Sequence, residues 1–363
     1  MFEPEFTIGP SIATDLMSIE GDRQAILELP ITVEVLAGLR ETARLAATHY
    51  STQIEGNRLT QAQVVEALAG AHFPGRERDE AEVRNYYSAL EHAESLSTSG
   101  GSIDEVELRR VHGLVLNGKA TPSPYRTGQN VIRNATSGGI VYLPPEASDV
   151  PELMAKLFEW INYHLATEEL PAPIVAAIAH YQYATIHPYY DGNGRTARLL
   201  TTLVLHRAGY GLKGIYSLDE HYAHDLAAYY AALTIGPSHN YSLGRAEADI
   251  TSFVSFFCQS MASSFAAVRA RAAAAQEAGP TLNDDSAALR QLEPRRRILL
   301  GLFRDHGTAT TAEMAAHLGV SLRTMASLAR KWVESGFLEI HDPSRKNRSY
   351  RLNQTYEKLV TGS

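Results

Sequence analysis

HPYYDGNGRTAR, residues 187–198, gathers a base, a carboxylate, a glycine-bracketed loop and two arginines into one short stretch. An apolar-periodic run over residues 199–205 follows at once, which predicts a helix. We expect that helix to open at Asn193 or Gly194. The backbone N–H groups of Gly192, Asn193 and Gly194 would then lie at the positive end of a helix, where they form a site for an anion.

The side chains of this stretch suit nucleotide chemistry. Arg195 and Arg198 are three residues apart, so both project from one helix face and can fork onto phosphate oxygens. Asp191 is a hard oxygen ligand for Mg²⁺ held between a carboxylate and phosphates. His187 is a base that titrates near neutral pH. The plainer alternative is a capped helix with a surface salt-bridge network and a loop histidine.

The stretch resembles the signature of the Fic (filamentation induced by cAMP) family, His-Pro-Phe-x-Asp/Glu-Gly-Asn-Gly-Arg-x-x-Arg. Every fixed position matches except Tyr189, which replaces phenylalanine. The resemblance implies a mainly α-helical bundle with a small β-hairpin flap. It also implies transfer of AMP from ATP to a hydroxyl side chain of a target protein. The added phenolic O–H of Tyr189 needs a partner when buried, but it touches none of this chemistry.

The resemblance also implies a role for each residue of the signature. His187 takes the proton from a target Ser, Thr or Tyr hydroxyl, whose oxygen attacks the α-phosphate as pyrophosphate leaves. Asp191 holds Mg²⁺, while Asn193 and the loop amides stabilise charge on the α-phosphate oxygens. Arg195 binds the nearer leaving phosphates, and Arg198 binds the γ-phosphate. ATP as substrate and Mg²⁺ are therefore the expected ligands.

STQIEGN, residues 51–57, resembles the family's inhibitory-helix pattern, Ser/Thr-x-x-x-Glu-Gly/Asn. Ser51 and Glu55 are four residues apart and share a helix face, and the Gly-Asn pair that follows is a helix stop signal. In relatives the glutamate pairs with the second signature arginine, here Arg198, and keeps it from the γ-phosphate. Without the signature, Glu55 is only a polar residue near a helix C-terminus.

A hairpin is predicted from strands over residues 126–133 and 140–143 with a turn at 134–139. In the family a hairpin at this position is the flap, which covers the active site and pairs with the target's backbone. Val141 and Tyr142 would serve that docking here. The alternative is a surface hairpin that packs on helices.

Helical periodicity predicts most of the remaining chain. Thr60 is expected to open one helix, and Ser102 to cap another with Glu105, whereas residues 1 to about 30 show only weak periodicity. The expected helices cover residues 32–50, 79–96, 102–117, 149–165, 173–186, 219–235 and 246–273. A tyrosine-bearing helix borders the adenine in the family, which implies this role for Tyr229 and Tyr230; ordinary aromatic packing is the alternative.

The composition is that of a globular protein, with 363 residues, 44% hydrophobic and 20% charged. The single cysteine, Cys258, excludes an intramolecular disulfide framework and is expected to be buried. No signal peptide or membrane-spanning run is found in the sequence, so we expect a cytoplasmic protein without membrane contact. Residues 281–363 carry 13 Lys and Arg against 9 Asp and Glu, a net charge of +4. Since the whole chain has a net charge of −8, residues 1–280 have a net charge of −12.

The C-terminal residues predict a second domain. Helices over residues 295–306, 311–318 and 321–335, then strands over 337–341 and 349–353, resemble a winged helix-turn-helix. Arg323, Arg330 and Lys331 on the third helix, with Arg345, Lys346 and Arg348 on the wing, could neutralise DNA phosphates. A protein-docking or dimerising domain is an equal alternative. We expect four parts: an N-terminal helical region with the inhibitory helix (1–110), a Fic core (111–275), a linker (276–290) and the winged helix (291–363).

The sequence therefore predicts a protein adenylyltransferase that Glu55 restrains. One rival is the reverse reaction, hydrolytic removal of AMP, with Glu55 aligning the water. The other is a DNA-binding regulator whose Fic body senses a nucleotide. A target protein with a hydroxyl side chain is the expected partner, and DNA binding and homodimerisation stay open.

Overall fold

The computed structural model describes residues 2–29, 33–98, 101–133, 139–236, 238–277, 292–344, 348–354 and 356–357. The described chain is mainly α-helical, as the sequence predicts. Its contacts divide it into two compact units. Unit 1 comprises residues 1–58 and 73–274, and unit 2 comprises residues 59–72 and 275–363.

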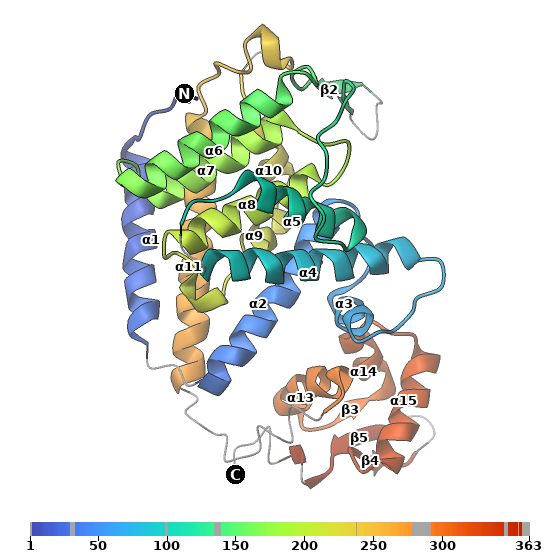
Figure 1. The fold of residues 1–363 in the computed structure, drawn as a ribbon. Coiled ribbons are helices and arrows are strands. Elements are labelled where there is room, and N and C mark those ends of the chain that lie inside the picture. The colour runs from blue at the N-terminus through green and yellow to red at the C-terminus, as the bar shows by residue number, and fades with distance from the viewer. Residues whose placement is uncertain are drawn as a thin grey trace. The chain divides into compact units, whose positions relative to one another are not determined.

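Unit 1 is built around helix α7 (Ala172–Ile186), which packs against α6 (Val150–Thr167) and α8 (Asn193–Arg207) (Figure 1). Almost every residue of α7 is buried, on all sides of the helix. A helix that is apolar all round belongs in a core. Since the 187–192 loop connects α7 to α8, the two ends of this loop are fixed by the best-packed pair of helices in the unit.

Other helices surround this pair. Helix α4 packs on α5, α8 and α2, and α2 packs on α9. Their bounds are α1 Pro10–Glu28, α2 Val33–Ile54, α4 Glu77–Thr98, α5 Glu105–Asn117, α9 Leu218–His224, α10 Leu226–Leu233 and α11 Thr251–Glu277, with 3₁₀ turns η1 Leu212–Gly214 and η2 Tyr241–Leu243.

Three local expectations were wrong. Helix α1 was missed because its core contact is a narrow stripe of isoleucines seven residues apart, at 12, 19 and 26. Helix α5 is capped by Asp104 instead of Ser102, because the Asp104 carboxylate accepts the N–H of Val106 at 2.8 Å. The helix expected over 219–235 is two helices, since Asp225 leaves the helical conformation and caps α10 through the N–H of Ala228.

The hairpin consists of β1 (Ile132–Arg133) and β2 (Ile140–Tyr142), which pair antiparallel. Residues 134–138, most of the expected turn, lie outside the described residues. Just beyond β2, Leu143 forms a parallel bridge with Asn240. The second strand is therefore anchored to unit 1 at its C-terminal end.

Unit 2 has a separate core with Trp332 and Phe337 among its largest buried side chains. Its sheet has the antiparallel order β3-β5-β4. Helix α3 (Gln61–Leu68), which Thr60 caps, also belongs to this unit and packs on α13. The other bounds are α13 Pro294–His306, β3 Ala309–Thr310, α14 Thr311–Leu318, α15 Leu322–Glu334, β4 Leu338–Asp342 and β5 Ser349–Leu352. Of the predicted linker and wing, residues 278–291 and 345–347 lie outside the described residues.

Two expectations drawn from composition can be compared with this fold. Cys258 is fully buried on α11, as predicted, and burial raises the pKa of its thiol to about 12. Within the described ranges, no helix has both the length and the hydropathy needed to cross a membrane.

Candidate active site

His187 ends helix α7 in a left-handed conformation, with φ of 52°. Its N–H donates to the carbonyl of Tyr183 at 3.0 Å, and Pro188 prevents the helix from continuing. The buried guanidinium of Arg126 donates to the His187 carbonyl at 3.0 Å. Backbone contacts on both sides therefore hold an otherwise unfavourable conformation.

The imidazole of His187 is set up as a neutral base. Burial lowers its pKa to about 4. Its Nδ1 lies 3.3 Å from the carbonyl of Ala184, which can only accept a hydrogen bond. The tautomer that satisfies this contact carries its proton on Nδ1 and leaves the Nε2 lone pair available.

The loop after His187 is closed by its own side chains. Asn193 accepts from the N–H of Tyr189 at 3.0 Å and donates to its carbonyl at 2.8 Å. The Tyr189 ring is buried and stacks on His112, with ring centroids 3.5 Å apart. His112 Nε2 lies 3.0 Å from the carbonyl of Asp191. The ring of Tyr189 thus packs in the loop's interior, beside a histidine that the sequence did not single out.

Helix α8 begins at Asn193, one of the two predicted positions, with Gly192 as its N-cap at φ of 77°. A Cβ at Gly192 would be strained at this φ and would meet His112 at 3.1 Å. A Cβ at Gly194 would collide with the Glu55 carboxylate. The first turn of α8 therefore lies directly under a carboxylate, which is the kind of group that a helix N-terminus attracts.

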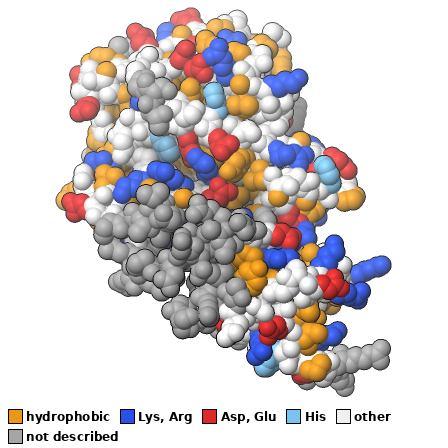
Figure 2. Space-filling view, turned by 60° about the horizontal axis from the view of Figure 1, so that its bottom comes forward, with side chains coloured by type: hydrophobic (Ala, Val, Ile, Leu, Met, Phe, Trp, Pro, Cys, Tyr) orange, Lys and Arg blue, Asp and Glu red, His pale blue; other side chains and the backbone are white. Residues whose placement is uncertain are grey.

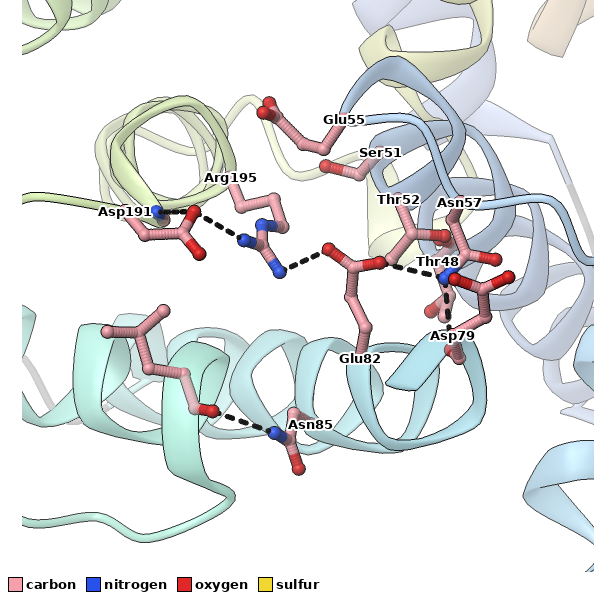
Figure 3. A network of polar contacts seen from close by, with 12 residues as sticks. Thr48, Ser51, Thr52, Glu55, Asn57, Asp79, Glu82, Asn85, Asp191 and Arg195 are labelled. Carbon is pink, nitrogen blue, oxygen red and sulfur yellow. Dashed lines mark hydrogen bonds and ion pairs between the residues drawn. The ribbon is translucent and has the colours of Figure 1, made fainter. Parts of the chain in front are cut away.

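Arg195 is held between two carboxylates (Figure 3). Its Nη1 lies 2.5 Å from Glu82 on α4, and its Nη2 donates to Asp191 at 3.1 Å. Asn57, two residues beyond Glu55, donates to the other oxygen of Glu82 at 2.8 Å. Burial raises the pKa of Glu82, and the charge of Arg195 opposes that shift. A chain of polar contacts therefore connects the signature arginine to the segment that follows α2.

Arg198 is buried and has three partners: Ser51 on α2, Glu55 directly after α2, and Asp219 on α9. Its Nη2 donates to Glu55 at 2.9 Å and to the Ser51 carbonyl at 2.8 Å. Its Nε donates to the Ser51 hydroxyl at 2.8 Å and lies 3.0 Å from Asp219. Its Nη1 is buried without a hydrogen-bond partner among the described residues. The same Nη1 lies 3.3 Å from the Cβ position of Gly194, at the start of α8.

Glu55 and Ser51 therefore contact one arginine from the end of α2. The Glu55 carboxylate lies over Gly194 while it binds Arg198, so one carboxylate occupies both components of the predicted anion site. The N-terminus of α8 and the unpartnered Nη1 of Arg198 both lie beside this carboxylate. The set is suited to a phosphate group.

Tyr229 and Tyr230 occupy different environments on α10. Tyr229 is buried, stacks on Tyr222 at 4.7 Å and lies 2.9 Å from His180 Nε2. Tyr230 is exposed and donates to the carbonyl of Ile54, the last residue of α2. Of the pair, only Tyr230 presents an accessible ring.

The two hairpin residues also differ. Tyr142 donates to the Thr185 carbonyl near the end of α7 at 2.8 Å, so it ties the hairpin to the helix that carries His187. Val141 is half-buried at the centre of β2.

Asp191 is the only signature carboxylate, and 60% of its side chain is exposed. Among the described residues, no group of three or more His, Cys, Asp or Glu side chains is placed to hold a metal. Mg²⁺ commonly takes one or two protein carboxylates and completes its shell with water and phosphate oxygens. An exposed carboxylate beside the candidate anion site fits that mode of binding.

Three residues of this site were not found from the sequence: His112, Glu82 and Asp219. Each lies on a different helix, far from the signature in sequence. None belongs to a local motif, so spacing alone carried no signal for them.

This chain is similar to known Fic proteins in sequence and in fold. Residues 102–205 match the Fic/DOC family. The Drosophila willistoni protein named "Protein adenylyltransferase Fic" is 29% identical over 197 residues, which are 54% of this chain and 38% of that protein. The chain thus spans less than half the length of the curated relatives it matches.

Solved structures of Fic proteins share the fold. A Fic family protein from Desulfovibrio desulfuricans G20 has a TM-score of 0.60 at 24% identity, over 97% of this chain and 99% of that one. Fic-1 (aa134–508) from C. elegans has a TM-score of 0.56 at 25% identity, over 74% and 73% of the two chains. The segment that matches the Fic/DOC family, residues 102–205, carries the loop between α7 and α8 and both signature arginines.

Proposed function

We propose that this protein transfers AMP from ATP to a hydroxyl side chain of a target protein and that Glu55 restrains the reaction. The observation that carries the proposal is the convergence of a neutral histidine, a helix N-terminus and two arginines at one loop. The names of the curated relatives support the same chemistry.

His187 acts as the general base. Its Nε2 takes the proton of the target hydroxyl, whose oxygen attacks the α-phosphorus of ATP, and pyrophosphate leaves. The amides at the start of α8 stabilise the charge that develops on the α-phosphate oxygens. Asn193 holds these amides in place, because its side chain already closes the loop onto Tyr189. Asp191 would hold Mg²⁺, which would neutralise phosphate charge.

The two arginines receive the leaving phosphates. Arg195 binds the nearer ones and Arg198 the γ-phosphate, through the Nη1 donor that is unpartnered among the described residues. In the described geometry the Glu55 carboxylate binds Nη2 of the same arginine and lies over Gly194, so ATP would bind productively only after Glu55 moves away. Tyr142 and Val141 would align the backbone of a target along β2. The exposed ring of Tyr230 is the better candidate for adenine stacking.

The test is incubation of the protein with Mg²⁺ and ATP labelled at either the α- or the γ-phosphate, with cell lysate as acceptor. We expect the α-label to be transferred to protein and the γ-label to stay in pyrophosphate. Transfer of the γ-label would identify a kinase instead. If neither label is transferred but a previously adenylylated protein loses AMP, the hydrolase alternative holds.

A second function is supported for unit 2. We propose that it is a winged helix-turn-helix that binds DNA through α15. Met325, Ala329 and Trp332 of α15 are buried, whereas Arg323 and Arg330 are exposed. Figure 2 shows acidic and basic side chains interspersed on one face of the protein, and binding through arginine–phosphate contacts should be strongly salt-dependent. Retention of the full chain on duplex DNA at low salt, lost in Arg323→Ala/Arg330→Ala, tests the proposal.

A further inference from the structure

Arg198 has a neighbour that the family signature does not contain. Asp219 lies in the first turn of α9, a segment that Ser217 caps, and it is almost completely buried. Its Oδ1 is 3.0 Å from Arg198 Nε. Burial raises the pKa of Asp219, and the charge of Arg198 is the largest opposing influence. Asp219 and Arg198 are therefore coupled inside unit 1.

Arg198 Nε and Asp219 Oδ1 are within hydrogen-bonding distance but do not form a hydrogen bond. The Nε hydrogen of Arg198 is donated to the Ser51 hydroxyl at 2.8 Å. Asp219 Oδ1 is consequently a buried acceptor without a donor among the described residues, although the carboxyl group as a whole also interacts with the Ser51 and Ser217 hydroxyls. Leaving a buried acceptor unsatisfied costs free energy, so this arrangement of Arg198 is not the best one available to Asp219.

Ser51 lies in the last turn of α2 and Glu55 is the residue directly after the helix, and both contact Arg198. A movement of the end of α2 that withdraws Glu55 therefore withdraws Ser51 as well. The Nε hydrogen is then free, and Asp219 is the nearest acceptor for it. The two Nη groups, which point to Glu55 and toward Gly194, are left for a ligand.

We propose that Asp219 is a positioning residue, which takes over the Nε of Arg198 when Ser51 and Glu55 release it and so aims the guanidinium at the γ-phosphate. The inference deepens the proposed function and rests on it. It assigns discrimination between nucleoside triphosphates and diphosphates to a pair of residues, Arg198 and Asp219. A diphosphate does not reach the Arg198 fork and gains nothing from Asp219.

The test uses Asp219→Asn in the full chain that also carries Glu55→Gly and Ser51→Ala, because Ser51 still binds the Nε of Arg198 after Glu55→Gly alone. Binding is measured by calorimetry with ADP and with an ATP analogue whose α–β bridge cannot be cleaved. We expect the Kd for the ATP analogue to rise roughly tenfold, as for loss of one charge-assisted hydrogen bond, and the Kd for ADP to stay unchanged. Ser217→Ala is the matched control, since it perturbs the start of α9 but keeps the Asp219 charge.

Unchanged or tighter binding of the ATP analogue would overturn the inference, because Asp219 would then be neutral or a competitor for Arg198. An equal loss for both nucleotides would also overturn it, since Asp219 would then support the fold alone. If Glu55→Gly by itself binds neither nucleotide, the proposed function has failed.

A second variant keeps the inference testable if Asp219→Asn does not fold. Ser51→Ala in the Glu55→Gly chain removes the rival acceptor for the Nε of Arg198 and keeps the Asp219 carboxylate, although it also removes the contact of the Ser51 hydroxyl with Asp219. It should tighten binding of the ATP analogue several-fold without affecting ADP, and the absence of this tightening would contradict the inference.

Discussion

Replacing Glu55 with glycine should release the proposed transferase. The Glu55 carboxylate binds Arg198 at 2.9 Å, with 28% of the Glu55 side chain and 2% of the Arg198 side chain exposed. A charge-assisted hydrogen bond of this kind contributes about 1.5–3 kcal/mol. Since 1.4 kcal/mol is a factor of ten, productive use of ATP should rise roughly 10- to 150-fold.

The structure indicates that this release is partial. Glu55→Gly leaves both hydrogen bonds from Arg198 to Ser51, through the Nε and Nη2 atoms. Adding Ser51→Ala should therefore increase the rate further. Glu55→Asp should restrain less well than wild type, because its side chain is one methylene shorter. Glu55→Gln keeps the shape and removes the charge, so it separates repulsion of the triphosphate from simple occupation of the site.

The assay is the initial rate of self-modification or lysate labelling with ATP labelled at the α-phosphate. If Glu55→Gly is no faster than wild type, the carboxylate over Gly194 restrains nothing and the reasoning fails. If the variant instead loses an AMP-removing activity, Glu55 aligns water and the hydrolase alternative is right.

Three further predictions follow from other parts of the structure. His187→Ala should slow transfer by roughly 10²-fold or more while nucleotide binding, measured by calorimetry, is retained; residual transfer within about tenfold would contradict its role as base. Burial lowers the pKa of His112 to about 4 and of His180 to about 3, so the unfolded chain takes up protons first. Stability should therefore fall as pH drops from about 6.5 toward 4, by about 1.4 kcal/mol per pH unit for each histidine, and equal urea midpoints at pH 7 and 5 would disprove this. Ending the chain at Glu277 should leave unit 1 able to unfold cooperatively. Residues 59–72 would lose their contacts with the rest of unit 2 and should be cleaved faster in limited proteolysis than in the full chain. Equal cleavage rates in the truncated and full chains would show that unit 2 does not stabilise these residues.

The part of the site formed by residues 187–198 could be predicted because these residues are consecutive in the sequence. The loop between α7 and α8 and the start of α8 depend on short-range patterns, a Pro after a helix and glycines at a helix start, whereas the approach of Glu55 to Arg198 was expected only from the family resemblance. These patterns are satisfied within a few residues of backbone, so reading them requires no knowledge of tertiary packing.

What the sequence could not provide is the set of long-range partners. Glu82 and Asp219 are ordinary acidic residues on amphipathic helices until packing places each beside a signature arginine. The grouping of residues 59–72 with unit 2 also has no local signal in the sequence. Glu66 on α3 forms an ion pair with Arg295, which is more than two hundred residues away in the sequence. No local sequence pattern predicts such a contact.

The four carboxylates around the arginines fall into two classes by exposure. Glu82 and Asp219 have 11% and 8% of their side chains exposed, whereas Asp191 and Glu55 have 60% and 28%. A buried carboxylate that loses its arginine pays a large desolvation penalty, while an exposed one is resolvated by water. Incoming phosphates should therefore displace the exposed member beside each arginine and leave the buried member in place. Each arginine keeps one fixed counter-ion and exchanges the other, so ATP can enter without leaving either guanidinium unsupported.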